Sequence, residues 1–290
     1  MNRSLNAIGA IARITLTEAL RQKTLNIVLL FSLVLLGGSD FFTQFSFQEE
    51  FKFLKDLAYA VISISGLLVA LMGAAQLIPA EIERRTLYTT LSKPVHRFEF
   101  VLGKYLGLLL LLTLIVGIMS AVFCGVLFWK EARVTGDILA GASGPLDEGQ
   151  QRMIDAVRAQ SRDPGMIQAV ALVWCKLAVT AAISVFFSTI ATSTIFIVST
   201  TLMIYFAGHL QAVARQLWLH EEASSGFLKQ GVLVVVSWLV PDFQAYNLID
   251  EIIAGNPVHW ADSAPILLYS FFYVVVIMAV AGLVFEEREL

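Results

Sequence analysis

"KYLGLLLLLTLIVGIMSAVFCGVLFW", residues 104–129, is an apolar run in which Lys104 is the only charged residue. A helix rises about 1.5 Å per residue, so the run exceeds the roughly 20 residues that cross a hydrocarbon core of about 30 Å. It lacks the alternation of apolar and polar residues that marks a strand of a membrane β-barrel. The run therefore predicts a membrane-spanning helix.

The rest of the chain is apolar to a similar degree. Of its 290 residues, 57% are hydrophobic and 15% charged, and the mean hydropathy is +0.75, whereas soluble domains average about 25% charged residues. Five further runs are long enough to span a membrane: 24–42, 57–79, 167–189, 191–212 and 264–285. A shorter run, 231–240, stops at Pro241 and predicts a re-entrant or interfacial segment. We expect an all-α polytopic membrane protein, a single domain over 1–290 with six transmembrane helices.

The distribution of basic residues predicts the orientation. Segments 1–23, 80–104 and 286–290 carry ten Lys/Arg and seven Asp/Glu. The segments that would lie on the other side carry nine Lys/Arg and sixteen Asp/Glu. Because short cytoplasmic segments are enriched in Lys and Arg, both termini are expected inside. Segments 130–166 and 213–263 are then extracytoplasmic, and 213–263 is expected to contribute re-entrant outer segments.

Residues 3–22 form an amphipathic helical pattern. Its apolar face carries Leu5, Ile8, Ala12, Leu16 and Ala19. The opposite, cationic face carries Arg3, Asn6, Arg13, Thr17 and Arg21. The separation of the two faces predicts an interfacial helix whose basic side chains meet anionic lipid headgroups.

The stretch "AEIERRTLYTTLSKPVHRFEF", residues 80–100, separates two predicted spans. Pro79 and Pro94 delimit room for one short helix, because proline and the residue before it disfavour the helical conformation. The i, i+3, i+4, i+7 stripe of this helix is formed by Arg84, Leu87, Tyr88 and Leu91. A free cytoplasmic loop has no reason to build such a stripe. Either the protein's own helix ends or a soluble partner must cover it.

The motifs "EIERRTLYTTLSKP" and "VHRFEFVLGKYLG" resemble the region between the second and third spans of type-2 ABC exporter permeases. The branch linked to multicopper-enzyme and nitrous oxide reductase maturation is the most similar. "FFSTIATST" and "LVPDFQAYNLIDEIIAG" are similar to family features in the same order. Arg85 replaces a common glycine, and the acidic tail "FEEREL" replaces a basic one. Neither departure touches the pattern of Glu81, Glu83, Thr86, Pro94 and Lys104.

The resemblance implies that 80–100 contains a coupling helix that fits a groove of an ATPase subunit. It implies two cytoplasmic ABC ATPase subunits and a second permease protomer, either a homodimer or a related chain, in a bacterial cytoplasmic (inner) membrane. No nucleic acid partner is expected. The residues expected to couple to the ATPase are Glu81, Glu83, Arg84, Thr86, Leu87, Tyr88, Leu91, Lys93, Pro94 and Arg97.

The chain contains no G-x-x-x-x-G-K-[ST] phosphate loop, no nucleophile elbow and no H-E-x-x-H. We therefore expect a permease subunit that is not an enzyme by itself and binds no cofactor, with ATP and Mg on the partner ATPase. The soft ligands Cys124, Cys175, Met119, Met203 and His209 do not recur at a metal-ligand spacing, so no metal site is predicted.

Lys176 is the one charged residue that lies clearly inside the membrane, well away from both ends of its predicted span. Intramembrane charges are functional candidates because their burial is costly. Lys176 lies about 21 Å from the inner end of its helix, within snorkelling reach of the outer headgroups. Snorkelling or an ion pair with an outer acid is favoured over contact with a transported substrate.

Two other function classes stay open. An ATPase-independent secondary transporter would normally place acidic or polar relay residues near mid-membrane. A membrane scaffold that anchors periplasmic partners would use the large outer segments. Segment 130–166, with a short helix expected over "QQRMIDAVRAQSRD", is either a docking site for a periplasmic partner or a solvated linker. The preferred function is the membrane permease subunit of an ATP-binding-cassette exporter.

Overall fold

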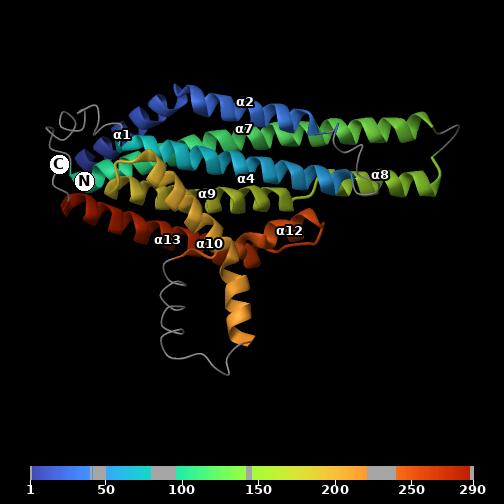
Figure 1. Ribbon diagram of the computed structural model, residues 1–290. Helices are drawn as coiled ribbons and strands as arrows, with labels where there is room; N and C mark the ends of the chain where they lie inside the picture. The colour runs from blue at the N-terminus through green and yellow to red at the C-terminus, as the bar shows by residue number, and fades with distance from the viewer. Residues whose placement is uncertain are drawn as a thin grey trace.

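The computed structural model describes residues 2–39, 41, 50–79, 96–141, 146–220 and 240–287, and these residues contain helices and no strand. Most of the helices run lengthwise in one elongated bundle (Figure 1). Their bounds are α1 Asn2–Leu20, α2 Lys23–Gly37, α4 Glu50–Leu77, α7 Arg97–Ala140, α8 Glu148–Ser161, α9 Gly165–Ile190, α10 Thr194–His220, η1 Phe243–Asn247, α12 Leu248–Ile253 and α13 Trp260–Glu287.

Within the described residues, five helical segments are long and apolar enough to cross a membrane: α4, α7, α8 with α9, the first part of α10, and α13. The helix pair Ser4–Leu20 and Lys23–Gly37, bent by 67°, brings the number to six if it counts as one span. The structure thus confirms an all-α polytopic membrane protein with five to six candidate spans. The start of α1 and the end of α13 lie at the same end of the bundle (Figure 1).

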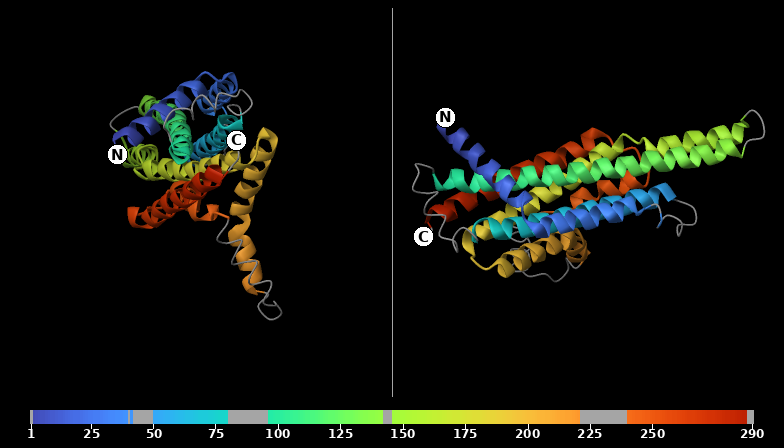
Figure 2. Two further views of the ribbon diagram at one scale, coloured as in Figure 1. Left: turned by 90° about the vertical axis from the view of Figure 1, so that its left-hand side faces the viewer. Right: turned by 90° about the horizontal axis from the view of Figure 1, so that it is seen from above.

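One predicted span boundary was wrong, and one helix continues beyond its predicted span. Helix α2 ends at Gly37 and has 15 residues, fewer than the run 24–42 predicts. Helix α7 does not stop at residue 129 but continues to Ala140, for 44 residues or about 66 Å. The polar residues after 129 continue the helix because α8 packs along them. The end of α7 and α8 together form a helical hairpin that extends beyond the other helices (Figure 2). The short helix expected in 130–166 is confirmed as α8.

Helix α7 carries a buried lysine near each end of its apolar run. The Nζ atom of Lys104 lies 3.9 Å from Glu18 of α1, and the Nζ atom of Lys130 lies 3.0 Å from Glu50 of α4. Both lysine side chains are 2% exposed. The two residues are separated by about 39 Å of helix, which exceeds the hydrocarbon thickness of about 30 Å. The two pairs therefore bracket the membrane-embedded part of the bundle.

A second, smaller core lies beside the main one. Leu172, Cys175, Val179 and Ile183 of α9 pack against Phe243 of η1. The predicted re-entrant run 231–240 lies almost entirely outside the described residues. The segment that follows it, η1 and α12, packs against α9, with Phe243 and Ile252 almost completely buried. The short helices are therefore part of the folded bundle.

Candidate functional site

Nine of the ten predicted coupling residues, from Glu81 to Pro94, lie in the range 80–95, which is outside the described residues. The tenth, Arg97, is the first residue of α7. The structure therefore shows what the residues 80–95 lead into: α7 begins at Arg97, within the predicted coupling segment 80–100.

Helix α1 crosses the beginning of α7 in direct backbone contact. A Cβ atom added to Gly107 would lie 2.5 Å from the Cβ of Thr15 and 2.7 Å from the carbonyl oxygen of Ala12. One added to Gly103 would lie 2.8 Å from the Cβ of Ile11. Since real Cβ atoms do not approach so closely, the two glycines are required for this crossing. The G-x-x-x-G pattern of α7 thus serves contact with α1.

The buried face of α1 differs from the apolar face that the sequence predicts. Ala12 and Ala19 are buried as expected, but Leu5 is 62% exposed and Thr15 is completely buried. The face turns toward Thr15 because the glycines of α7 allow closest approach there. The apolar side chains left outside, such as Ile14, are available to lipid.

Helix α13 meets the beginning of α7 on another side. The guanidinium Nη1 of Arg97 donates to the carbonyl oxygens of Phe285 and Glu286, at 3.3 and 3.1 Å. These carbonyls lie in the last turn of α13 that the structure describes, and a cation at the C-terminal end of a helix complements the helix dipole. The rings of Phe100 and Phe285 stack with centroids 5.9 Å apart. The first turn of α7 is therefore joined to the end of the chain as well as to α1.

Lys176 is half-buried on α9 and points at the second core. Its Nζ atom lies 5.4 Å from the centre of the Tyr205 ring on α10, a cation–π distance. Lys176 also interacts electrostatically with Asp250 of α12. Burial and the nearby charge of Asp56 raise the pKa of Asp250, and the positive charge of Lys176 lowers it in part. The geometry brings Lys176 to an acid of the predicted outer segment 213–263. Its role in substrate contact stays a hypothesis.

We predict that replacing Lys176 with methionine changes stability by about 0 to 1 kcal/mol, because Asp250 is exposed enough to remain hydrated. Methionine keeps the apolar packing on Tyr205, and Lys176→Arg keeps the charge as well. Thermal unfolding of the purified variants measures the change. Normal folding combined with loss of transport only in Lys176→Met would indicate that the charge contacts substrate.

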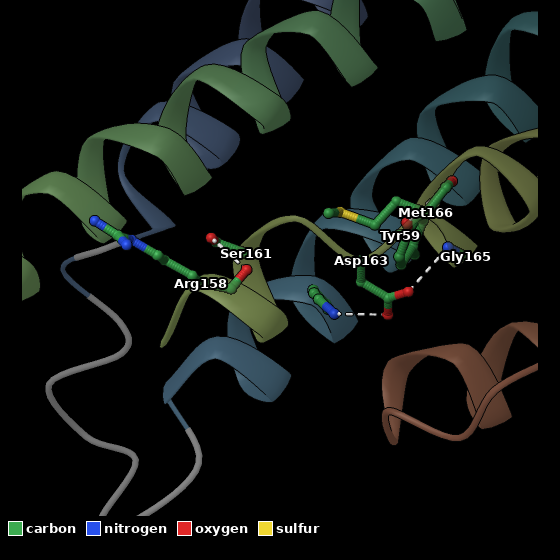
Figure 3. Close-up of polar contacts among 7 residues, drawn as sticks. Tyr59, Arg158, Ser161, Asp163, Gly165 and Met166 are labelled. Atoms are coloured by element: carbon green, nitrogen blue, oxygen red, sulfur yellow. Dashed lines mark hydrogen bonds and ion pairs between the residues drawn. The ribbon is translucent and has the colours of Figure 1, made fainter. Parts of the chain in front are cut away.

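At the other end of the bundle, charged side chains gather where α4, α7, α8 and α9 meet. The Nζ atom of Lys55 lies 3.2 Å from Asp163, whose second carboxylate oxygen accepts the backbone N–H of Gly165 at 2.9 Å (Figure 3). Glu131 of α7 accepts hydrogen bonds from Ser161 at 2.6 Å and from Arg162 at 2.7 Å. These bonds join the base of the α7–α8 hairpin to the bundle.

The sequence reasoning missed these pairs. Lys55 and Asp163 are 108 residues apart, and each lies in a polar segment where solvated charges are ordinary. A usable signal was their position only a few residues outside the apolar runs, where a basic or acidic residue on the buried face needs a partner. Among the described residues, no three His, Cys, Asp or Glu side chains cluster as metal ligands would.

The sequence matches the family model described as ABC-2 family transporter protein over residues 10–290. No curated protein matches the sequence significantly. The match covers the bundle from α1 to α13, including the α7 junction and the segment 80–95 before it. Permeases of this family typically lack a nucleotide-binding domain, which implies an ATPase partner. The chain is a multi-pass membrane protein that belongs to the ABC-2 transporter family and is its membrane component.

Proposed function

We propose that the chain is the permease subunit of an ATP-driven exporter, in which residues 80–100 receive the movement of a cytoplasmic ATPase. The observation that carries the proposal is the junction at the beginning of α7. The helix that follows the coupling segment, α7, packs against α1 with their backbones in contact. Its first residue, Arg97, is hydrogen-bonded to the end of α13. A displacement of 80–95 is therefore transmitted to both terminal helices at once.

The family resemblance supplies the rest of the mechanism. Two ATPase subunits that close on ATP and Mg would tilt the helices at 81–93. A second permease protomer, identical or related, would complete the assembly, and the tilt would open or squeeze the interface between the protomers. The pair formed by the buried Lys104 of α7 and the exposed Glu18 of α1, 3.9 Å apart, links the two helices near the site of this movement. The output is transport or a mechanical signal across the membrane.

The branch of the family is a finer proposal. It rests on the resemblance of 81–94 and of "VHRFEFVLGKYLG" to permeases of nitrous oxide reductase maturation, while "FFSTIATST" and "LVPDFQAYNLIDEIIAG" are similar to features of the wider family. The substrate classes compatible with that branch are a lipid, a peptide, or a copper or sulfur species. A signal passed to a periplasmic partner without a transported substrate is equally compatible.

The test is to purify the chain from its native membrane and to ask whether an ABC ATPase comes with it. We expect co-purification and a change of ATPase turnover on reconstitution with the permease. A chain that transports without any ATPase would be a secondary transporter, and one that holds outer partners without changing ATPase turnover would be a scaffold. Either result would reject the proposal.

We also propose that both termini and 80–95 lie inside, and that the α7–α8 hairpin lies outside. In a background with Cys124 and Cys175 replaced by alanine, an impermeant thiol reagent added to intact cells should label Met153→Cys, whose parent side chain is 61% exposed on α8. Thr90→Cys should react only after permeabilisation. The reverse pattern would invert the orientation that the Lys/Arg distribution predicts.

A further inference from the structure

A pocket of about 920 Å³ lies at the base of the α7–α8 hairpin. Its walls come from the start of α4, the end of α8, the turn at 163–165 and the loop at 253–258. The volume is within the range of about 300 to 1,000 Å³ typical of sites for small molecules. Among the described residues, Lys176 is not part of the lining.

The pocket lies at the level of lipid headgroups. Its lining residues Lys55, Val134, Gly165 and Val258 each lie two to six residues outside the neighbouring apolar runs, which is at most about 10 Å along a helix. The headgroup region is about 5 to 8 Å deep on each side of the hydrocarbon.

Two tryptophans mark the same level. Trp129, next to the buried Lys130, is 54% exposed, and Trp260, the first residue of α13, is 55% exposed. Exposed tryptophans gather at membrane–water interfaces. The pocket is thus in the leaflet at the opposite end of the bundle from Arg97.

The lining carries charges of both signs beside apolar side chains. Lys52 and Lys55 supply ammonium groups, and Glu50 and Asp163 supply carboxylates. The Lys55 side chain is 4% exposed and is held by Asp163, so that its charge is fixed at the wall. A ligand that carries both a phosphate and an ammonium matches this set by charge-assisted hydrogen bonds. Phe51, Ile253 and Val258 offer an apolar wall to the part of the ligand nearest the hydrocarbon.

We propose that this pocket binds the headgroup of a zwitterionic phospholipid with a primary amine, of the phosphatidylethanolamine type. The phosphate lies toward Lys52 and Lys55, and the ammonium lies toward Glu50 and Asp163. The proposal does not depend on the identity of the exported substrate or on the ATPase.

The experiment uses the purified full-length chain in detergent and native mass spectrometry with added palmitoyl-oleoyl phosphatidylethanolamine. Ala159→Trp fills the pocket from an exposed position at the end of α8. Ala156→Trp, exposed one turn earlier on the same helix and outside the lining, is the matched control. Lys52→Gln removes one ammonium group without adding volume. Two competitors are added separately: soluble glycerophosphoethanolamine and dioleoylglycerol, which has no charged headgroup.

We expect the wild type and Ala156→Trp to retain one phosphatidylethanolamine, with occupancy about tenfold lower in Ala159→Trp and in Lys52→Gln. Neither competitor should displace the lipid at equal concentration. Retention of the lipid by Ala159→Trp at the wild-type level would overturn the proposal. Equal binding of dioleoylglycerol would show annular lipid only, and displacement by the soluble headgroup would show a site for a soluble ligand. Both of these results also reject a phospholipid site.

Discussion

Replacing Gly107 with leucine is expected to release α1 from α7. The added side chain would meet the Ala12 carbonyl oxygen, a backbone atom that cannot rotate away, so the whole helix must move. The displacement exposes Ile11, Ala12 and Ala19, all now buried. Lost burial and overpacking together cost about 2 to 5 kcal/mol. The spans should still insert, because leucine raises the hydropathy of α7 and the other spans are unchanged.

Limited trypsin digestion of the purified protein measures this release. Arg13 lies on the exposed side of α1, and cleavage there requires the helix to unfold locally. The matched control is Gly117→Leu, which lies on α7 like Gly107. Its position is exposed, and an added Cβ atom would meet no other atom within 4 Å. Equal digestion rates for Gly107→Leu and Gly117→Leu would contradict the crossing described here. If α1 belongs to the coupling path, only Gly107→Leu should also lower ATPase stimulation.

Changing Tyr88 and Leu91 together to serine is expected to separate the ATPase from the permease. Both residues lie outside the described residues, so the prediction rests on the apolar stripe in the sequence. Burial of each side chain in an ATPase groove is worth roughly 1.5 to 3 kcal/mol before ordering costs. The double change should weaken assembly by about 3 to 6 kcal/mol, a loss of two or more orders of magnitude in affinity.

Co-purification of the ATPase with the membrane-inserted variant is the measurement, with a membrane-fraction blot to verify insertion. Glu81→Gln and Glu83→Gln serve as controls in the same stretch, because exposed rim charges contribute only about 0 to 1 kcal/mol. Wild-type recovery of the ATPase with the double serine variant would mean that the protein itself covers the stripe. The coupling role of 80–100 would then be wrong, while the membership of the ABC-2 family would stand.

Hydropathy and helix length were enough to predict the helical character of this protein and the positions of most of its spans from the sequence alone. A hydrocarbon core of about 30 Å sets one length for every span, so the helical character and position of 57–79 or 167–189 follow from a linear count of apolar residues. The same count placed Lys176 within α9 and away from the C-terminal end of that helix at Ile190. The polar helix α8 was also predicted, over "QQRMIDAVRAQSRD", but it begins earlier, at Glu148, where Asp147 is its N-cap.

Contacts between distant segments were decided only by the tertiary structure. The sequence shows two glycines at Gly103 and Gly107, but not that α1 crosses them, because glycine is common in membrane helices. Nor does it show that α7 continues to Ala140, which depends on packing with α8. The Lys55–Asp163 pair joins residues 108 positions apart and leaves no local pattern. A buried charge is tolerable only beside its partner, and only the packed bundle brings the two together.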